Sequence, residues 1–182
     1  MISCTVEENK MCLPDIMECD NFSNINVYMD RLYDNVFKKD FISGHVTFNG
    51  MKVCIRREPM DGNREHGFIH MTHEDFSHNS GDLNDRVPDF RRSERLPWVK
   101  YIIENYDCAM RNRCGKILFW EEMYRGYVRV HLLYEEERFL VVLEKRKYGY
   151  FIITSFYLDK EWEFEKRKRK YQQYMKQKTP LV

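Results

Sequence analysis

Two histidines in the stretch FIHMTHED are the residues best suited to proton transfer. His70 and His73 lie three residues apart, and an imidazole with its ordinary pKa of about 6.5 accepts and returns a proton near neutrality. Neither HExxH nor a Cys/His zinc spacing accompanies them, so we assign no metal site. Two interpretations stay open. Either His70 is a general acid or base with His73 second to it, or one histidine is a packed or capping residue at the end of a strand.

Arginines gather around an expected helix start in the stretch DFRRSERLPWVK. Guanidinium groups match phosphate oxygens in a bidentate way, and a helix N-terminus adds free N–H groups. The candidate phosphate-binding residues are Arg91, Arg92, Arg95 and Lys100. Ordinary surface charge is the competing explanation for Arg95 and Lys100, and Trp98 is expected to pack against the sheet rather than on a base.

Arg129 and His131 project from one face of an expected strand whose other face is apolar. Polar residues on the open face of a half-buried sheet are common, so these two alone indicate little. Thr154, on the last expected strand, can lie near them in an antiparallel meander. A hydroxyl beside arginine and histidine can hold a phosphate during transfer.

The C-terminal segment EKRKRKYQQYMKQK carries positive charge with tyrosines interleaved. Such a run is typical of a surface that follows a phosphate backbone, and a solvated helix face is the common alternative. The candidate RNA-binding residues in this run are Lys166, Arg167, Lys168, Arg169 and Lys170.

The elements that must position these residues indicate an α+β fold. We expect an antiparallel sheet of about four main strands with helices packed on one face, preceded by an N-terminal helix and a small hairpin at Asn49-Gly50. Short turns between the strands require antiparallel neighbours. The predicted elements, in chain order, are a helix at about 24–41, hairpin strands at 45–48 and 51–55, an extended segment at 67–71, a polar loop at 77–88, a helix from about 93, strands at 116–121, 127–133, 138–144 and 150–156, and a helix at about 159–178.

Length and composition fit one compact unit. The 182 residues are 43% hydrophobic, enough for one domain with a core, which we divide into a helical extension at 1–40 and an α+β domain at 41–182. The net charge is only +1, yet the chain end is basic, which suggests a local anionic partner.

Other motifs exclude some classes of protein. No GxGxxG, GKS/T or GxSxG segment occurs, which disfavours P-loop and serine esterase chemistry. The six cysteines form no CxxC pair, and no signal peptide is recognisable, so we expect free thiols in a cytoplasmic protein. No apolar run approaches the roughly 20 residues that cross a bilayer, and we expect no membrane association.

The order of these features resembles the phage-encoded branch of the barnase–EndoU–colicin–RelE (BECR) ribonuclease group. The resemblance covers roughly residues 40–160. It rests on a GFxHxT segment at 67–72, an arginine-rich helix start followed by WVKYIIE at 98–104, and an ITSFY segment at 153–157.

The resemblance implies a metal-independent endoribonuclease without cofactors, serving as a toxin or phage-conflict effector, with RNA and an antitoxin or immunity protein as partners. The RNA 2′-hydroxyl would attack the adjacent phosphate to give a 2′,3′-cyclic phosphate. Our hypothesis for the residues themselves is that His70 transfers protons, with His73 second to it, that Arg95 and Arg129 neutralise charge, and that Thr154 positions the phosphate. The alternatives are a non-catalytic RNA-binding phage protein, an inhibitor of a host enzyme, and a structural phage protein.

Overall fold

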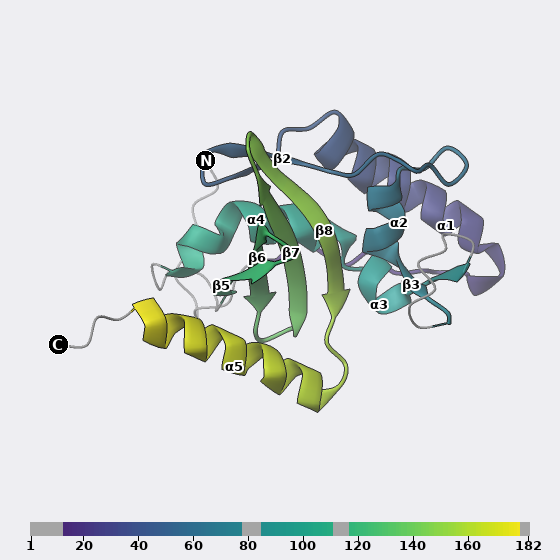
Figure 1. Ribbon diagram of the computed structural model, residues 1–182. Helices are drawn as coiled ribbons and strands as arrows, with labels where there is room; N and C mark the ends of the chain where they lie inside the picture. The colour runs from purple at the N-terminus through teal and green to yellow at the C-terminus, as the bar shows by residue number, and fades with distance from the viewer. Residues whose placement is uncertain (1–12, 78–84, 111–116, 179–182) are drawn as a thin grey trace, which may run out of the picture.

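A curled, mixed β-sheet is the centre of the fold (Figure 1). The computed structural model describes residues 13–77, 85–110 and 117–178. The sheet has six strands in the order β1-β2-β8-β7-β6-β5. Their bounds are Thr47–Phe48 (β1), Met51–Cys54 (β2), Ile117–Tyr124 (β5), Tyr127–Tyr134 (β6), Phe139–Arg146 (β7) and Gly149–Tyr157 (β8). The α+β class is therefore confirmed, but the expectation of about four strands is too low.

The four strands of the C-terminal half form the antiparallel meander expected from their short turns. The additional strands come from the Asn49-Gly50 hairpin, where β1 pairs with β2. β2 then lies parallel to β8, with Val53 opposite Tyr150. Gly149 permits this approach, because a Cβ atom there would lie 2.4 Å from the carbonyl oxygen of Lys52. A parallel pair between segments so distant in sequence leaves no local signal.

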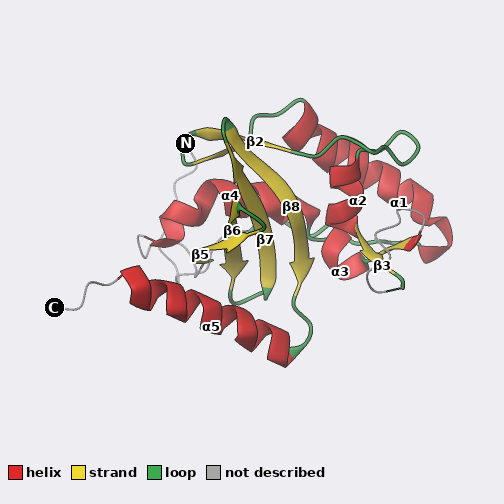
Figure 2. Cartoon of the chain, in the orientation of Figure 1, coloured by secondary structure: helices red, strands yellow, loops and turns green. Residues whose placement is uncertain are grey.

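Helices cover both faces of the sheet, so the expectation of helices on one face is wrong (Figure 2). One face packs in a core with residues of α1, of the π-helix η2 that continues it, of α2 and of α4. The other face packs against α5 through Phe164, Trp120 and Leu140. The helices span Phe22–Asn24 (η1), Ile25–Leu32 (α1), Tyr33–Ile42 (η2), His66–Thr72 (α2), Phe90–Ser93 (α3), Leu96–Met110 (α4) and Glu161–Lys178 (α5). None of the described helices is long and apolar enough to cross a membrane.

The expected helices near both ends of the chain are confirmed. α1 and η2 cover the range predicted at about 24–41, and they bury Leu32 and Phe37 in the core. α5 covers the predicted terminal helix. Trp98 packs against the sheet as expected: it is 6% exposed, and its ring lies 5.7 Å from that of Phe139 on β7.

The extended segment predicted at 67–71 is wrong, because these residues form the helix α2. Phe68, Met71 and Thr72 fall at i, i+3 and i+4 and are all buried, which is a helical pattern. Gly67 lets this helix approach the preceding chain closely, with its amide donating to the carbonyl of Arg56 at 2.8 Å. Tertiary packing thus determines the helical conformation of a segment whose aromatic and β-branched residues would also suit a strand.

The polar loop predicted at 77–88 is shorter than expected. Residues Arg86–Pro88 form β4, which pairs antiparallel with β3 at His73–Asp75. Residues 78–84 of the predicted loop lie outside the described part of the chain. This small sheet directly follows α2 and fixes its C-terminal end.

Candidate functional site

Two cavities meet at His70, on the side of β8 next to α2. The first, of about 1050 Å³, lies between α2 and the β7–β8 turn; we call it the basic cavity. The second, of about 1260 Å³, lies between α3, β8 and the start of α5. His70 and Ile153 line both cavities. A ligand that extends across β8 would therefore pass His70.

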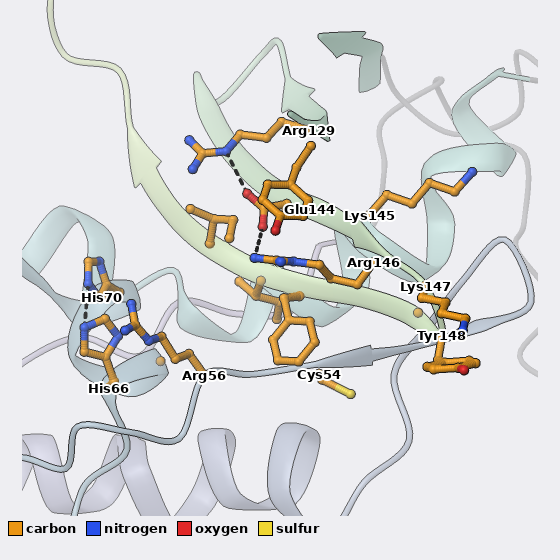
Figure 3. Close-up of a pocket in the computed structure, with 16 residues that line it drawn as sticks. Cys54, Arg56, His66, His70, Arg129, Glu144, Lys145, Arg146, Lys147 and Tyr148 are labelled. Atoms are coloured by element: carbon orange, nitrogen blue, oxygen red, sulfur yellow. Dashed lines mark hydrogen bonds and ion pairs between the residues drawn. The ribbon is translucent and has the colours of Figure 1, made fainter. Parts of the chain in front are cut away.

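A pair of histidines stands at the wall of the basic cavity (Figure 3). His66 and His70 are one helical turn apart on α2, and their Nε2 atoms lie 3.2 Å apart. At that distance one Nε2 carries a proton and the other accepts it, since two protonated nitrogens or two bare ones would repel. One N–H proton therefore lies between the two facing Nε2 atoms.

Both histidines of the pair are neutral at pH 7. Burial lowers the pKa of His70 to about 3, and the charges of Arg86, Arg92 and neighbouring groups act in the same direction. The pKa of His66 is also lowered, first by burial and then by Arg56 and Arg86. A bound anion would offset these positive charges and would raise both pKa values.

A buried carboxylate holds two arginines on the opposite wall of the basic cavity. The side chain of Glu144 is 5% exposed, and its Oε2 lies 3.4 Å from Nε of Arg129. Its Oε1 forms an ion pair with Arg146. Figure 3 shows Glu144 between these two arginines. Two guanidinium groups on one carboxylate leave positive charge unbalanced at this wall.

Among the described residues, five basic side chains line the basic cavity, against the single carboxylate of Glu144. They are Arg56, Arg129, Lys145, Arg146 and Lys147. The cavity wall is completed by aromatic rings, Tyr127, Tyr148 and Phe151. This combination of charge and aromatic surface suits a phosphate ester joined to a planar base.

Two other residues singled out in the sequence, Arg129 and Thr154, lie on the walls of the cavities that meet at His70. Arg129 lines the same cavity as His70. Thr154 lines the second cavity, and its hydroxyl donates to the backbone carbonyl of His70 at 3.3 Å. Thr154 therefore contacts the backbone of α2, and its hydroxyl holds the end of that helix against β8.

His73 lines neither cavity. It is 8% exposed, and its Nδ1 lies 2.8 Å from the hydroxyl of Thr72. Burial lowers its pKa to about 4. These observations fit the alternative interpretation, a packed histidine at the start of a strand.

The predicted arginines at the start of the helix have separate surroundings. Arg92 lines the second cavity, where it donates to the carbonyls of His70 and His73 at 3.2 and 2.6 Å. A cation at these free carbonyls stabilises the end of α2. Arg91 lines the same cavity and is largely exposed, with Asp159 3.9 Å away.

Arg95 and Lys100 do not line either cavity. The guanidinium of Arg95 lies over the rings of Trp98 and Tyr157, at 5.1 and 5.3 Å. Lys100 pairs with Asp40 at 3.3 Å, where α4 packs against η2. The structure therefore does not bring these two residues to His70.

The basic run of α5 also lies outside both cavities. Of the described residues of α5, Trp162 and Glu163 line the second cavity, and the basic residues do not. Lys170 pairs with Glu122 at 2.6 Å, Lys168 with Glu135 at 3.1 Å, and Arg167 with Glu163 at 3.8 Å. Lys166 and Arg169 are exposed. Much of the run's charge is therefore neutralised by neighbouring carboxylates.

Sequence reasoning missed His66 and the basic segment of the β7–β8 turn. The HxxxH spacing from His66 to His70 was a usable signal, but the strand interpretation places those rings far apart. The segment KRKYGY at 145–150 has the same alternation of charge and tyrosine as α5, and it lines the cavity with residues 145–149.

No group of three or more His, Cys, Asp or Glu side chains suited to a metal ion occurs in the described ranges. Cys19 and Cys54 are free thiols. Comparisons with protein-family models, with curated proteins and with solved structures gave no match.

Proposed function

We propose that the chain is a metal-independent endoribonuclease that cleaves RNA through a 2′,3′-cyclic phosphate. The observation that carries the proposal is the His66–His70 pair, whose Nε2 atoms are hydrogen-bonded to each other at the wall of a cavity lined by five of the described basic residues. Neutral imidazole is the form that accepts a proton, and the arginines supply charge where a phosphate would lie.

The reaction needs one base and one acid. A neutral imidazole of the pair takes the proton of the 2′-hydroxyl, the freed oxygen attacks phosphorus, and the bond from phosphorus to the 5′-oxygen breaks. The second imidazole, protonated once the phosphate has raised its pKa, returns a proton to the departing 5′-oxygen. The pair provides two groups 3.2 Å apart for these two transfers.

Charge on the phosphorane oxygens is neutralised by arginine. Arg129 lines the cavity, and Arg56 is exposed beside His66 (Figure 3). Since Arg95 stands outside both cavities, we transfer its proposed electrostatic role to Arg56. Thr154 contributes through the carbonyl of His70 rather than as a direct phosphate ligand.

Membership of the BECR group belongs to the same proposal. Two of the three segments that carry the resemblance lie at this site. Residues 67–72 lie in α2 and include His70, and residues 153–157 lie on β8, which packs against α2. A ribonuclease of this group would act in the cytoplasm as a toxin or phage-conflict effector. An antitoxin or immunity protein would be its partner.

A second candidate is a non-catalytic RNA-binding or host-enzyme-inhibiting phage protein. The pKa of His70, lowered to about 3 by burial, favours it, because a base so weak transfers protons poorly near neutrality. The basic cavity would then bind an anionic partner without chemistry.

One experiment separates the two candidates. Purified protein is incubated with a labelled RNA in excess EDTA, beside His70→Ala and the control His45→Ala, whose histidine is exposed and lines neither cavity. We expect cleavage by the wild type and by His45→Ala, and its loss in His70→Ala with RNA binding retained. Intact RNA at high protein concentration, or cleavage that needs a metal ion, would refute the nuclease.

A further inference from the structure

Two hairpin turns with exposed tyrosines lie at one end of the meander. The turn after β5 is flanked by Tyr124 and Tyr127, and the turn after β7 contains Tyr148. Tyr148 is 83% exposed, Tyr127 43% and Tyr124 39%. Exposed aromatic rings gathered in one place commonly mark binding surfaces.

Cations lie over the faces of these rings. Arg146 stands 3.8 Å from the ring centre of Tyr127, Arg129 stands 3.8 Å from that of Tyr124, and Lys147 stands 5.0 Å from that of Tyr148. Arg146, Arg129 and Lys147 also line the basic cavity. The rings and the phosphate-compatible charges therefore form one surface.

We propose that Tyr127 and Tyr148 form a platform on which an unpaired base stacks, beside the phosphate held in the basic cavity. This inference rests on the proposed function and names the form of its substrate, a single-stranded RNA segment. Both tyrosines line the cavity that contains His66 and His70. A base can stack on a tyrosine only when it is free of its own helix, whereas a duplex keeps its bases inside.

The aromatic rings favour RNA over an acidic peptide as the occupant. A peptide carboxylate would pair with the lysines and arginines and would leave the exposed surface of the tyrosine rings in water. A nucleotide uses both, since its phosphate pairs with the cations and its base covers a ring. Tyr148 is the ring with most of its surface available.

The test measures binding without cleavage. The probe is a fluorescent 2′-O-methyl uridine octamer, which lacks the attacking hydroxyl, and its Kd is read by anisotropy. We expect Tyr148→Leu to weaken binding about tenfold and Tyr148→Phe to stay within about twofold, because stacking needs only the ring. The matched control is Met123→Ala: Met123 is 67% exposed in the same end of the meander, but it points to the opposite face from Tyr124.

Two further probes identify the occupant. An octamer with abasic residues should bind the wild type as weakly as the intact octamer binds Tyr148→Leu, and poly-glutamate should not displace the intact octamer. The platform is refuted if the octamer does not bind, if Tyr148→Leu binds like the wild type, or if poly-glutamate competes fully. Cleavage of unmodified RNA is scored separately: tyrosine-dependent binding without cleavage would refute the nuclease alone, and His70-dependent cleavage without a tyrosine effect would refute the platform alone.

Discussion

The Nε2 atoms of His66 and His70 lie 3.2 Å apart across one turn of α2. This contact exists because α2 is a helix, in which residues four apart share a face. Both rings line the basic cavity. The relationship makes the two histidines a hydrogen-bonded pair in which one ring can accept a proton from a ligand and the other can donate one.

The first prediction concerns this pair. We expect His66→Ala and His70→Ala each to lower kcat/KM for a labelled RNA by at least about a hundredfold, since each removes one partner of an acid–base pair. His73→Ala should have less than a tenth of that effect on catalysis, because His73 lines neither cavity. Equal losses from His73→Ala and His70→Ala in folded protein would contradict the assignment.

The second prediction concerns the pH dependence of cleavage. The pKa of His70 is lowered to about 3, so the neutral base persists well below the ordinary value of 6.5. The acid limb of kcat/KM, which reports the free enzyme, should therefore lie below pH 6.5. Arg56 contributes to this lowering for both histidines, and Arg56→Met should move the limb toward higher pH. An acid limb at pH 6.5 or above in the wild type would contradict the role of His70 as a base with a lowered pKa.

The third prediction concerns Glu144, whose buried carboxylate holds Arg129 and Arg146. Glu144→Gln should lower the free energy of unfolding by about 2 kcal/mol, because two guanidinium groups lose their counter-charge. The same change should tighten RNA binding, since one negative charge leaves the cavity. The control is Glu161→Gln, whose side chain is 65% exposed beside Arg138; it should cost less than about 0.5 kcal/mol. Urea denaturation and anisotropy measure the two effects, and weaker RNA binding by folded Glu144→Gln would be the contrary result.

The fourth prediction separates two roles of Thr154. Its hydroxyl donates to the carbonyl of His70 at 3.3 Å, so Thr154→Val should cost about 1 kcal/mol of stability and slow cleavage by displacing α2. Thr154→Ser retains the donor and should behave like the wild type in both measurements. If Thr154→Val keeps full activity, the contact does not position the histidine.

The fifth prediction concerns stability in acid. Burial lowers the pKa of His131 and of His73 to about 4 each, so both are neutral in the folded state and titrate near 6.5 when unfolded. Their contribution is complete above pH 6.5 and is lost as the pH falls toward 4, by up to about 3 kcal/mol each. Urea denaturation between pH 7 and 4 should show this fall, and His131→Leu should flatten it by about one proton. The account would be contradicted if the free energy of unfolding of His131→Leu fell with pH as steeply as that of the wild type and of the control His45→Ala.

The sequence predicted the elements whose signals are local. Alternation along Val128, Val130 and Leu132 marked β6, and Asn49-Gly50 marked the β1–β2 hairpin. It did not predict the parallel pairing of β2 with β8, which depends on the close approach of Gly149 to Lys52. Nor did it predict that α5 covers the second face of the sheet. That face carries polar residues such as Arg129 and Thr154 beside the apolar ones on which Phe164 packs.

The candidate site was also predicted only in part, because residue types can be read from the sequence but their packing cannot. His70 and Arg129 were recognised by residue type, and the packing of α2 against β8 brings His70 to the cavity that Arg129 lines. His66 was overlooked because Gly67–Met71 was interpreted as extended, and the error in α2 hid the i, i+4 contact. The basic run of α5 drew attention by its length, while the shorter KRKYGY segment lines the cavity. The sequence alone does not show that carboxylates from distant segments, such as Glu122 and Glu135, neutralise part of the positive charge of α5.

The most direct test of the nuclease is the chemistry of the product ends. An RNA oligonucleotide is incubated with the protein in EDTA, and the fragments are analysed by mass spectrometry. We expect 2′,3′-cyclic phosphate and 5′-hydroxyl ends, no such ends with His70→Ala, and no cleavage at a position where a single 2′-deoxy nucleotide removes the attacking hydroxyl. Intact RNA, or fragments with 3′-hydroxyl and 5′-phosphate ends, would contradict the role assigned to the His66–His70 pair.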